Sequence, residues 1–129
     1  MSQRYTYLHH PTCSKATTAA KLVDEQIPGL YKRIDYLDNP PTTEELTAIL
    51  NLMDEQDLRL VVRTENLTSD EKNPVEKGLD VQSLVSLLQV DISRLQRPIL
   101  VDHVLGKATV GRPMERLHVI LALKGQSHF

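Results

Sequence analysis

Apolar positions in the first third of the chain alternate between strand-like and helix-like spacing. Tyr5 and Tyr7 stand two residues apart in a segment rich in aromatic and β-branched side chains, which predicts a first strand. The apolar residues that follow recur at the spacing of one helix face: Ala16, Ala19, Ala20, Val23 and Ile27. Pro28 and Gly29 end that pattern, and residues 30–37 return to a strand-like alternation. The chain is therefore expected to begin with a β-α-β unit.

The middle of the chain has helical spacing with one polar interruption. Thr42 and Glu45 have the spacing of a capping box, in which each side chain bonds the backbone N–H of the other residue. We expect the helix that they open to be followed by a short helix at about residues 55–62. The polar residues 63–77 predict a surface loop or an irregular helix. The apolar positions of the last helix in this region are Val81, Leu84, Val85 and Leu88.

The end of the chain predicts a β-hairpin and a closing helix. Residues 98–101 are a compact apolar run, and a turn connects them to a second short strand at residues 108–110. Pro113 suits the first turn of a helix, which we expect to end at Lys124 and Gly125. The expected core positions of this helix are Met114, Leu117, Ile120 and Leu121.

A parallel β-α-β unit that is followed by a hairpin and a helix has the element order of the thioredoxin fold. We therefore predict an α/β protein with a thioredoxin-like β-α-β / β-β-α core at about residues 1–41 and 96–129. The helical residues at about 42–95 would be an insertion between the two halves. A length of 129 residues is the size of one domain, which we place at residues 1–129.

Composition and charge narrow the classes of function. The chain has 15 Lys and Arg residues and 17 Asp and Glu residues, and this net charge of −2 argues against direct binding of nucleic acid. No apolar run approaches the roughly 20 residues that span a bilayer, and the first residues lack the apolar stretch of a signal peptide. One cysteine cannot form an internal disulfide. We expect a cytoplasmic protein without a membrane segment.

Cys13 lies between the first predicted strand and the first turn of the predicted helix. Unpaired backbone N–H groups and the helix dipole stabilise an anion at such a position, so a thiolate there has a lowered pKa and is reactive. His9, His10 and Lys15 add potential positive charge nearby. The alternative is a buried structural cysteine, and the polar neighbours Ser14 and Lys15 speak against it.

Other chemistries fit the sequence less well. His9, His10 and Cys13 provide three metal ligands at most, whereas a structural zinc site takes four, so no metal is expected. The Gly-x-Ser-x-Gly motif of hydrolases and a glycine-rich phosphate-binding loop are both absent from the sequence.

Five segments in chain order resemble the glutaredoxin-coupled arsenate reductase family, and together they cover nearly the whole chain. They are His-His-Pro-Thr-Cys-Ser-Lys at residues 9–15, Tyr-Leu-Asp-Asn-Pro-Pro-Thr at residues 36–42, Leu-Val-Val-Arg at residues 60–63, Gln-Arg-Pro-Ile-Leu-Val at residues 96–101 and Gly-Lys-Ala-Thr-Val-Gly-Arg-Pro at residues 106–113. Each segment alone is a weak signal, but five in the same order make a specific match.

The resemblance implies a thioredoxin-like fold and an enzyme that reduces arsenate to arsenite. In that family a cysteine thiolate, here Cys13, attacks arsenate and forms an arsenic–sulfur adduct. Glutathione then attacks the adduct, arsenite leaves, and glutaredoxin reduces the resulting mixed disulfide. The implied partners are therefore arsenate or a similar small oxyanion, glutathione as co-substrate, and glutaredoxin, with no bound cofactor.

The resemblance also implies roles for further residues. The active-site histidine of the family corresponds to His9, and its three oxyanion-binding arginines correspond to Arg63, Arg97 and Arg112. Guanidinium groups suit this task because they bind tetrahedral oxyanions with charge-assisted, often bidentate hydrogen bonds. A cis bond between Arg97 and the next residue is implied as well. The implied supporting residues are Ser14, Lys15 and Pro98.

The sequence leaves two other functions open. In the family pattern Cys-Ser-Lys is followed by Ser-Arg, whereas this chain has Ala16 and Thr17, which removes a hydroxyl and a positive charge. One alternative is therefore a glutathione-dependent thiol oxidoreductase that acts on another substrate. The other is a non-enzymatic, Spx-like regulator that binds RNA polymerase, although many Spx-type regulators carry Cys-x-x-Cys and this chain has a single cysteine.

Overall fold

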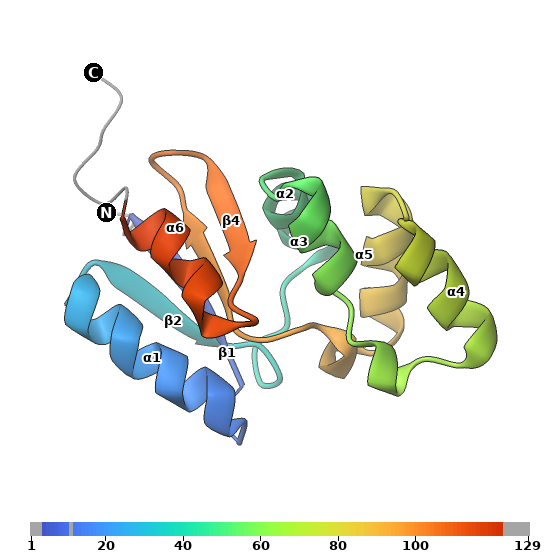
Figure 1. Cartoon of the computed structure of the whole chain (residues 1–129), viewed down its shortest axis with the longest axis horizontal. Coiled ribbons are helices and arrows are strands. Elements are labelled where there is room, and N and C mark those ends of the chain that lie inside the picture. Colours follow the sequence, from blue (N-terminus) through green and yellow to red (C-terminus); the bar gives the residue numbers. More distant parts are fainter. Residues whose placement is uncertain (1–3, 11, 123–129) are drawn as a thin grey trace.

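The computed structural model describes residues 4–10 and 12–122 and contains a four-stranded mixed sheet (Figure 1). The strands lie in the order β2-β1-β3-β4, and their bounds are Tyr5–His9 for β1, Tyr31–Asp35 for β2, Ile99–Asp102 for β3 and Lys107–Val110 for β4. β1 runs parallel to β2 and antiparallel to β3, and β3 and β4 form an antiparallel hairpin. The β-α-β unit and the hairpin are thus joined through the central pair of β1 and β3.

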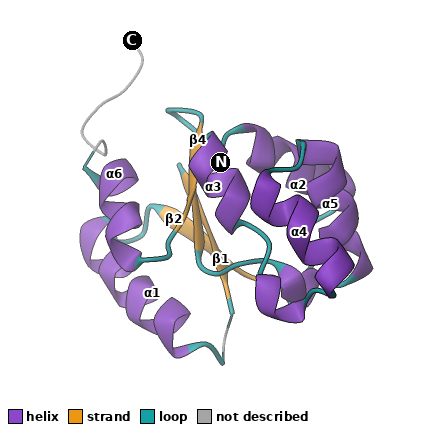
Figure 2. Ribbon diagram, turned by 45° about the vertical axis from the view of Figure 1, so that its right-hand side comes forward, coloured by secondary structure: helices purple, strands orange, loops and turns teal. Residues whose placement is uncertain are grey.

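Helices α1 (Ser14–Gln26) and α6 (Leu117–Leu121) cover one face of this sheet (Figure 2). Residues two apart in a strand point to the same face, which explains why Tyr5 and Tyr7 both lie on the α1 side. Leu8, the residue after Tyr7, packs on the opposite side of the sheet. The buried residues between the sheet and these two helices are Tyr5, Tyr7, Ala19, Val23, Ile27, Leu100, Leu117, Ile120 and Leu121.

Four helices of the insertion lie on the other side of the sheet (Figure 2). Their bounds are Thr43–Asn51 for α2, Glu55–Leu60 for α3, Ser69–Lys77 for α4 and Val81–Val90 for α5. The predicted capping box opens α2, and the apolar faces of the insertion pack with Leu8, Ile99 and Val101 of the sheet into the larger of two hydrophobic cores. The prediction of an α/β fold with a thioredoxin-like core and a helical insertion is confirmed.

The polar residues between α3 and α5 form a 3₁₀ turn at Thr64–Asn66 and the helix α4 at Ser69–Lys77, which contains Pro74. The hydroxyl of Thr68 accepts a hydrogen bond from the N–H of Glu71 (3.3 Å), and the Glu71 carboxylate accepts one from the N–H of Thr68 (3.1 Å). This capping box starts α4, and the buried side chain of Val75 anchors the helix to the core. The alternative of a surface loop is therefore wrong for residues 69–77. Hydrophobic periodicity does not reveal this helix, because a capping box and one buried side chain stabilise it in place of a continuous apolar face.

Several element boundaries also differ from the sequence prediction. The second strand covers Tyr31–Asp35, a shorter range than residues 30–37, and the closing helix starts with a 3₁₀ turn at Met114–Arg116 before α6 begins. The expected end of that helix at Lys124 and Gly125 lies outside the described residues. None of the described helices is long and apolar enough to cross a membrane.

Candidate active site

The strand pairing brings three loops together at one edge of the sheet. Ile99, at the start of β3, pairs with Leu8 near the end of β1 and with Val110 at the end of β4. The segments that follow β1, precede β3 and follow β4 therefore meet at this edge. In chain order these segments carry Cys13, Arg97 and Arg112.

Cys13 is the N-cap residue of α1 and has an extended backbone, with φ −88° and ψ 118°. Its N–H donates to the carbonyl of His10 (3.2 Å), and its carbonyl accepts from the N–H of Thr17 (3.0 Å). These bonds fix the backbone on both sides of the thiol. The residue is half-buried, so the sulfur is held in place and still has access to solvent. The structure thus places the cysteine at the helix start, where the sequence predicts it.

Arg112 makes the direct contact with the thiol. Its Nη2 donates to the Cys13 Sγ at 3.3 Å, and its Nε donates to the carbonyl of Arg97 at 2.8 Å. Within the described residues, these two bonds use two of the five N–H donors of a guanidinium. The remaining donors are available to an oxyanion beside the sulfur.

Arg97 and Arg63 enter the site from two segments that are bonded to each other. An isolated β-bridge joins the residues after α3 to the residues before β3, and the N–H of Arg63 donates to the carbonyl of Arg94 at 2.7 Å. Arg97 Nη1 lies 3.5 Å from the carbonyl of Ser93, whereas its buried Nε has no hydrogen-bond partner in the described part of the chain. The insertion therefore holds Arg63 next to the segment that carries Arg97.

The positive charges of Arg97 and Arg63 both affect the pKa values of His10 and Tyr36. Burial, followed by these two guanidinium groups, lowers the pKa of His10. Burial raises the pKa of the Tyr36 hydroxyl, and the same two arginines oppose that rise. The rings of His10 and Tyr36 are in edge-to-face contact, with centroids 6.1 Å apart. Arg63 and Arg97 therefore both lie near His10 and Tyr36.

Burial by itself would raise the pKa of the Cys13 thiol. The N–H of Ala16, the guanidinium of Arg97 and the N–H of Lys15 stabilise the thiolate and oppose this effect. With the positive charge of Arg112 they outweigh burial and lower the pKa of Cys13 below that of an ordinary thiol. A lowered pKa increases the thiolate fraction at neutral pH, and the thiolate is the nucleophilic form.

His9, the predicted active-site histidine, lies buried at the end of β1. Its side chain is 1% exposed on β1, and its ring lies against the ring of Tyr7, with centroids 5.6 Å apart. Burial lowers the pKa of His9, and among residues 4–10 and 12–122 its Nδ1 has no hydrogen-bond partner. The same residues contain no group of three side chains that could hold a metal ion. His9 is thus a buried imidazole whose pKa is lowered by burial.

Known proteins resemble this chain in sequence over most of its length. A model of the ArsC family matches residues 8–120. The chain belongs to the ArsC family. It is 32% identical over 114 residues to the arsenate reductase of Neisseria meningitidis serogroup A, with 88% of this chain and 94% of that protein covered. It is 27% identical over 114 residues to the arsenate reductase of Haemophilus influenzae, with 88% and 95% covered.

A solved structure supports the same membership. The arsenate reductase from Vibrio cholerae superimposes with a TM-score of 0.72 at 26% identity, and the match covers 93% of this chain and 99% of that one. The family resemblance that the five sequence segments indicated is therefore confirmed.

The implied supporting residues surround Cys13 in this ArsC-family chain. Pro98 is buried, its bond to Arg97 is cis as the resemblance implies, and its carbonyl accepts a hydrogen bond from the N–H of Gly111 at 2.8 Å. Ser14 and Lys15 are exposed in the first turn of α1 and face a cavity of about 450 Å³ beside the thiol. The residues that line this cavity are Ser14, Lys15, Thr18, Gly111, Arg112, Pro113 and Met114.

A buried ion pair that no sequence motif indicates joins α3 to the segment after β4. Asp57 of α3 is 3% exposed, and its carboxylate accepts a hydrogen bond from Arg116, which is 59 positions away in the chain. An acidic residue in the first turn of a helix is ordinary, because it complements the helix dipole. No local signal therefore marks Asp57, and only the tertiary structure shows that it is paired.

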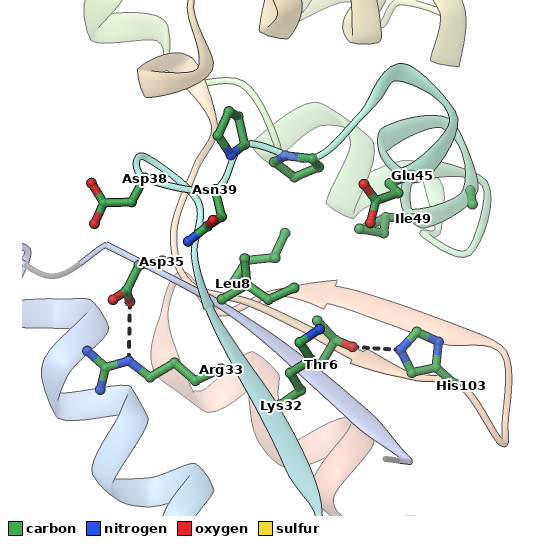
Figure 3. A pocket seen from close by; sticks show the side chains of 14 residues that line it. Thr6, Leu8, Lys32, Arg33, Asp35, Asp38, Asn39, Glu45, Ile49 and His103 are labelled. Carbon is green, nitrogen blue, oxygen red and sulfur yellow. Dashed lines mark hydrogen bonds and ion pairs between the residues drawn. The ribbon is translucent and has the colours of Figure 1, made fainter. Parts of the chain in front are cut away.

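A larger cavity of about 920 Å³ lies on the insertion side of β1 and β2 (Figure 3). Its wall contains a hydrogen bond between Thr6 and His103 (2.7 Å) and an ion pair between Arg33 and Asp35 (3.3 Å). Cys13 does not line it, and neither do the three predicted oxyanion-binding arginines. We assign the candidate active site to the surroundings of Cys13, because a thiol with a lowered pKa lies there with the guanidinium groups of Arg97 and Arg112. The smaller cavity adjoins this site through Ser14 and Arg112.

Proposed function

We propose that this protein reduces arsenate to arsenite through Cys13. The observation that carries the proposal is the hydrogen bond from the Arg112 guanidinium to the sulfur of a half-buried cysteine at the start of a helix. The names of its relatives support arsenate as the substrate, since arsenate reductases match this chain over about nine-tenths of its length.

The proposed reaction has two covalent steps. The Cys13 thiolate attacks arsenic(V), a sulfur–arsenic bond forms, and one arsenate oxygen leaves as water. The thiol of glutathione then forms a disulfide with the Cys13 sulfur while the sulfur–arsenic bond breaks. The bonding electron pair stays on arsenic, which leaves as arsenite, so the two sulfur atoms supply the two electrons. Glutaredoxin reduces the Cys13–glutathione disulfide and restores the thiol.

Three arginines support the first step. Attack by a thiolate on an oxyanion brings two negative charges together, so a site must neutralise and orient the substrate before bonds form. Arg112 lies against the sulfur, and Arg97 contributes to its lowered pKa. Arg63 is held beside Arg97 by backbone bonds. We assign oxyanion binding to these three residues.

The cavity beside Cys13 supports glutathione as the co-substrate. Glutathione is an anionic thiol, and the wall of the cavity includes the cationic side chains of Lys15 and Arg112 together with the apolar side chain of Met114. A ligand there would contact Arg112, which donates to the sulfur with which glutathione must form a disulfide. His9 has support only from the family resemblance, because it is buried beside Tyr7.

The test is arsenite production from arsenate, glutathione and glutaredoxin with the purified protein. We expect continuous turnover, and we expect the Cys13→Ser variant to form no arsenite above the background without enzyme. Equal arsenite formation by both proteins would overturn the proposal.

One observation favours a second candidate function, a glutathione-dependent thiol oxidoreductase that acts on another substrate. Ala16 supplies a backbone N–H to the thiol but has no hydroxyl, and Thr17 has no positive charge. The anion site therefore depends more on backbone groups than the family pattern predicts. Rapid reduction of hydroxyethyl disulfide by glutathione, combined with no arsenite production, would favour this second function.

A further inference from the structure

One carboxylate of the insertion binds the strand that leads to Arg112. The Oδ1 atom of Asp57 accepts hydrogen bonds from the Thr109 hydroxyl (3.0 Å), the N–H of Val110 (3.0 Å) and Nη2 of Arg116 (2.5 Å). Arg116 also donates through Nε to the carbonyl of Val110 (3.2 Å). Both backbone polar groups of Val110, the last residue of β4, are therefore bonded to this ion pair.

Gly111 and Arg112, the two residues after Val110, connect the end of β4 to the thiol. The N–H of Gly111 donates to the carbonyl of Pro98, and a Cβ atom on Gly111 would lie 2.9 Å from Pro98 Cγ and 3.0 Å from Leu117. The backbone thus passes between two side chains with no space to spare. Arg112 follows directly, and its guanidinium reaches the Cys13 sulfur. The path from the ion pair to the sulfur is continuous and closely packed.

We propose that Asp57 and Arg116 are positioning residues that hold Arg112 against Cys13. Neither of them is within hydrogen-bond distance of the sulfur in the described structure, so they act through the end of β4. The insertion is then part of the machinery that sets the reactivity of the cysteine. The inference rests on the proposed function for its effect on arsenate turnover, but its effect on the thiol needs no substrate.

The other end of α3 supports the same role for the insertion. The carbonyl of Val61 accepts a hydrogen bond from the N–H of Gln96 at 2.7 Å, and the N–H of Arg63 donates to the carbonyl of Arg94. The first turn of α3 is thus bonded to the strand that leads to Arg112. The residues just after α3 are bonded to the segment that leads to Arg97.

The chain contains a matched control for this ion pair. Asp102 is 0% exposed, accepts hydrogen bonds from Arg4 (3.1 and 3.2 Å) and accepts two more from the N–H groups of Val104 (3.0 Å) and Leu105 (3.2 Å). It is therefore a second buried aspartate that pairs with an arginine and fixes the backbone next to a strand. Asp102 pairs in register with Tyr5, at the edge of the sheet opposite the thiol.

The experiment compares Asp57→Asn with Asp102→Asn by the pH dependence of Cys13 alkylation and by urea unfolding. An opposite charge in contact with a thiol changes its pKa by about 1–3 units, so misplacing Arg112 should raise the alkylation midpoint by about half a unit or more in Asp57→Asn. Asp102→Asn should lose stability with no change in the midpoint. In an Arg112→Ala background, Asp57→Asn should raise the midpoint no further, because both changes act through one group.

Two results would overturn the proposal. One is a wild-type alkylation midpoint in folded Asp57→Asn, and the other is an equal shift in Asp102→Asn. Arg116→Gln is the second variant if Asp57→Asn does not fold, because the Arg116 side chain is partly exposed. We expect the same upward shift in Arg116→Gln and a smaller one in Arg116→Lys, which keeps the positive charge beside Asp57. An unshifted midpoint in folded Arg116→Gln would also refute the role.

Discussion

Replacement of Arg112 by alanine removes the hydrogen bond of 3.3 Å to the Cys13 sulfur and the charge that accompanies it. A hydrogen bond to a charged group contributes about 1.5–3 kcal/mol, and solvent access at a half-buried thiol favours the lower end of that range. About 1.4 kcal/mol corresponds to one pKa unit. We therefore expect the pKa of Cys13 to rise by about one unit in Arg112→Ala.

The assay is the rate of iodoacetamide alkylation of Cys13 as a function of pH. A thiolate with a higher pKa is intrinsically more nucleophilic, with a Brønsted coefficient of about 0.4–0.5. At a pH below both midpoints, a tenfold loss of thiolate would therefore appear as a rate that is only about three- to fourfold slower. The midpoint of the profile is the better readout, because it moves by the full change in pKa.

Arg59→Ala is the matched control for the loss of one arginine. Arg59 forms an exposed i,i+4 ion pair with Glu55 on α3, and such a pair contributes about 0.3–0.5 kcal/mol. We expect this variant to have the wild-type alkylation midpoint. If the profiles of Arg112→Ala and the wild-type protein superimpose, the contact between guanidinium and sulfur does not set the reactivity of Cys13.

Three other predictions test the site and its packing. Arg97→Ala should lose about 2–5 kcal/mol of transition-state stabilisation, measured as a fall in kcat/KM for arsenate, and an unchanged kcat/KM would exclude Arg97 from oxyanion binding. Gly111→Ala should lower the unfolding free energy in urea by about 1–3 kcal/mol, because the new methyl group has no room beside Pro98; wild-type stability would contradict this. Burial lowers the pKa of His9 below the unfolded value of about 6.5, so the unfolded state binds more protons and the unfolding free energy should fall as pH drops below that value. His9→Phe should reduce this slope between about pH 7 and 5.5, and parallel pH curves would refute the assignment.

Local patterns predict the elements whose stability is local. The alternation of Tyr5 and Tyr7 identifies β1, because side chains two residues apart share one face of a strand. The Thr42–Glu45 capping box identifies the start of α2, because its two partners are three residues apart. The position of Cys13 between a strand and a helix likewise predicts a stabilised thiolate, and the N–H groups of Lys15 and Ala16 contribute to it. The helix start is thus the part of the candidate site that a single sequence reveals.

The convergence of arginines on that thiol is a property of the tertiary structure. Arg63, Arg97 and Arg112 are far apart in the sequence, and only the order β2-β1-β3-β4 and the backbone bonds around Leu95 bring their segments together. In the sequence analysis their role came from the family resemblance alone. No pattern indicated Asp57, because its partner lies at the other end of the chain.

The central claim is that Cys13 forms a covalent bond to the arsenic atom of a bound oxyanion, and that the Cys13 and glutathione sulfurs together supply the two electrons that reduce it. A single turnover without glutaredoxin tests it most directly, with arsenate and glutathione added to the purified protein and both products measured. We expect one arsenite to be released for each protein molecule that carries glutathione on Cys13, at matching rates. Glutathione on Cys13 without release of arsenite, or arsenite formed without modification of Cys13, would contradict it.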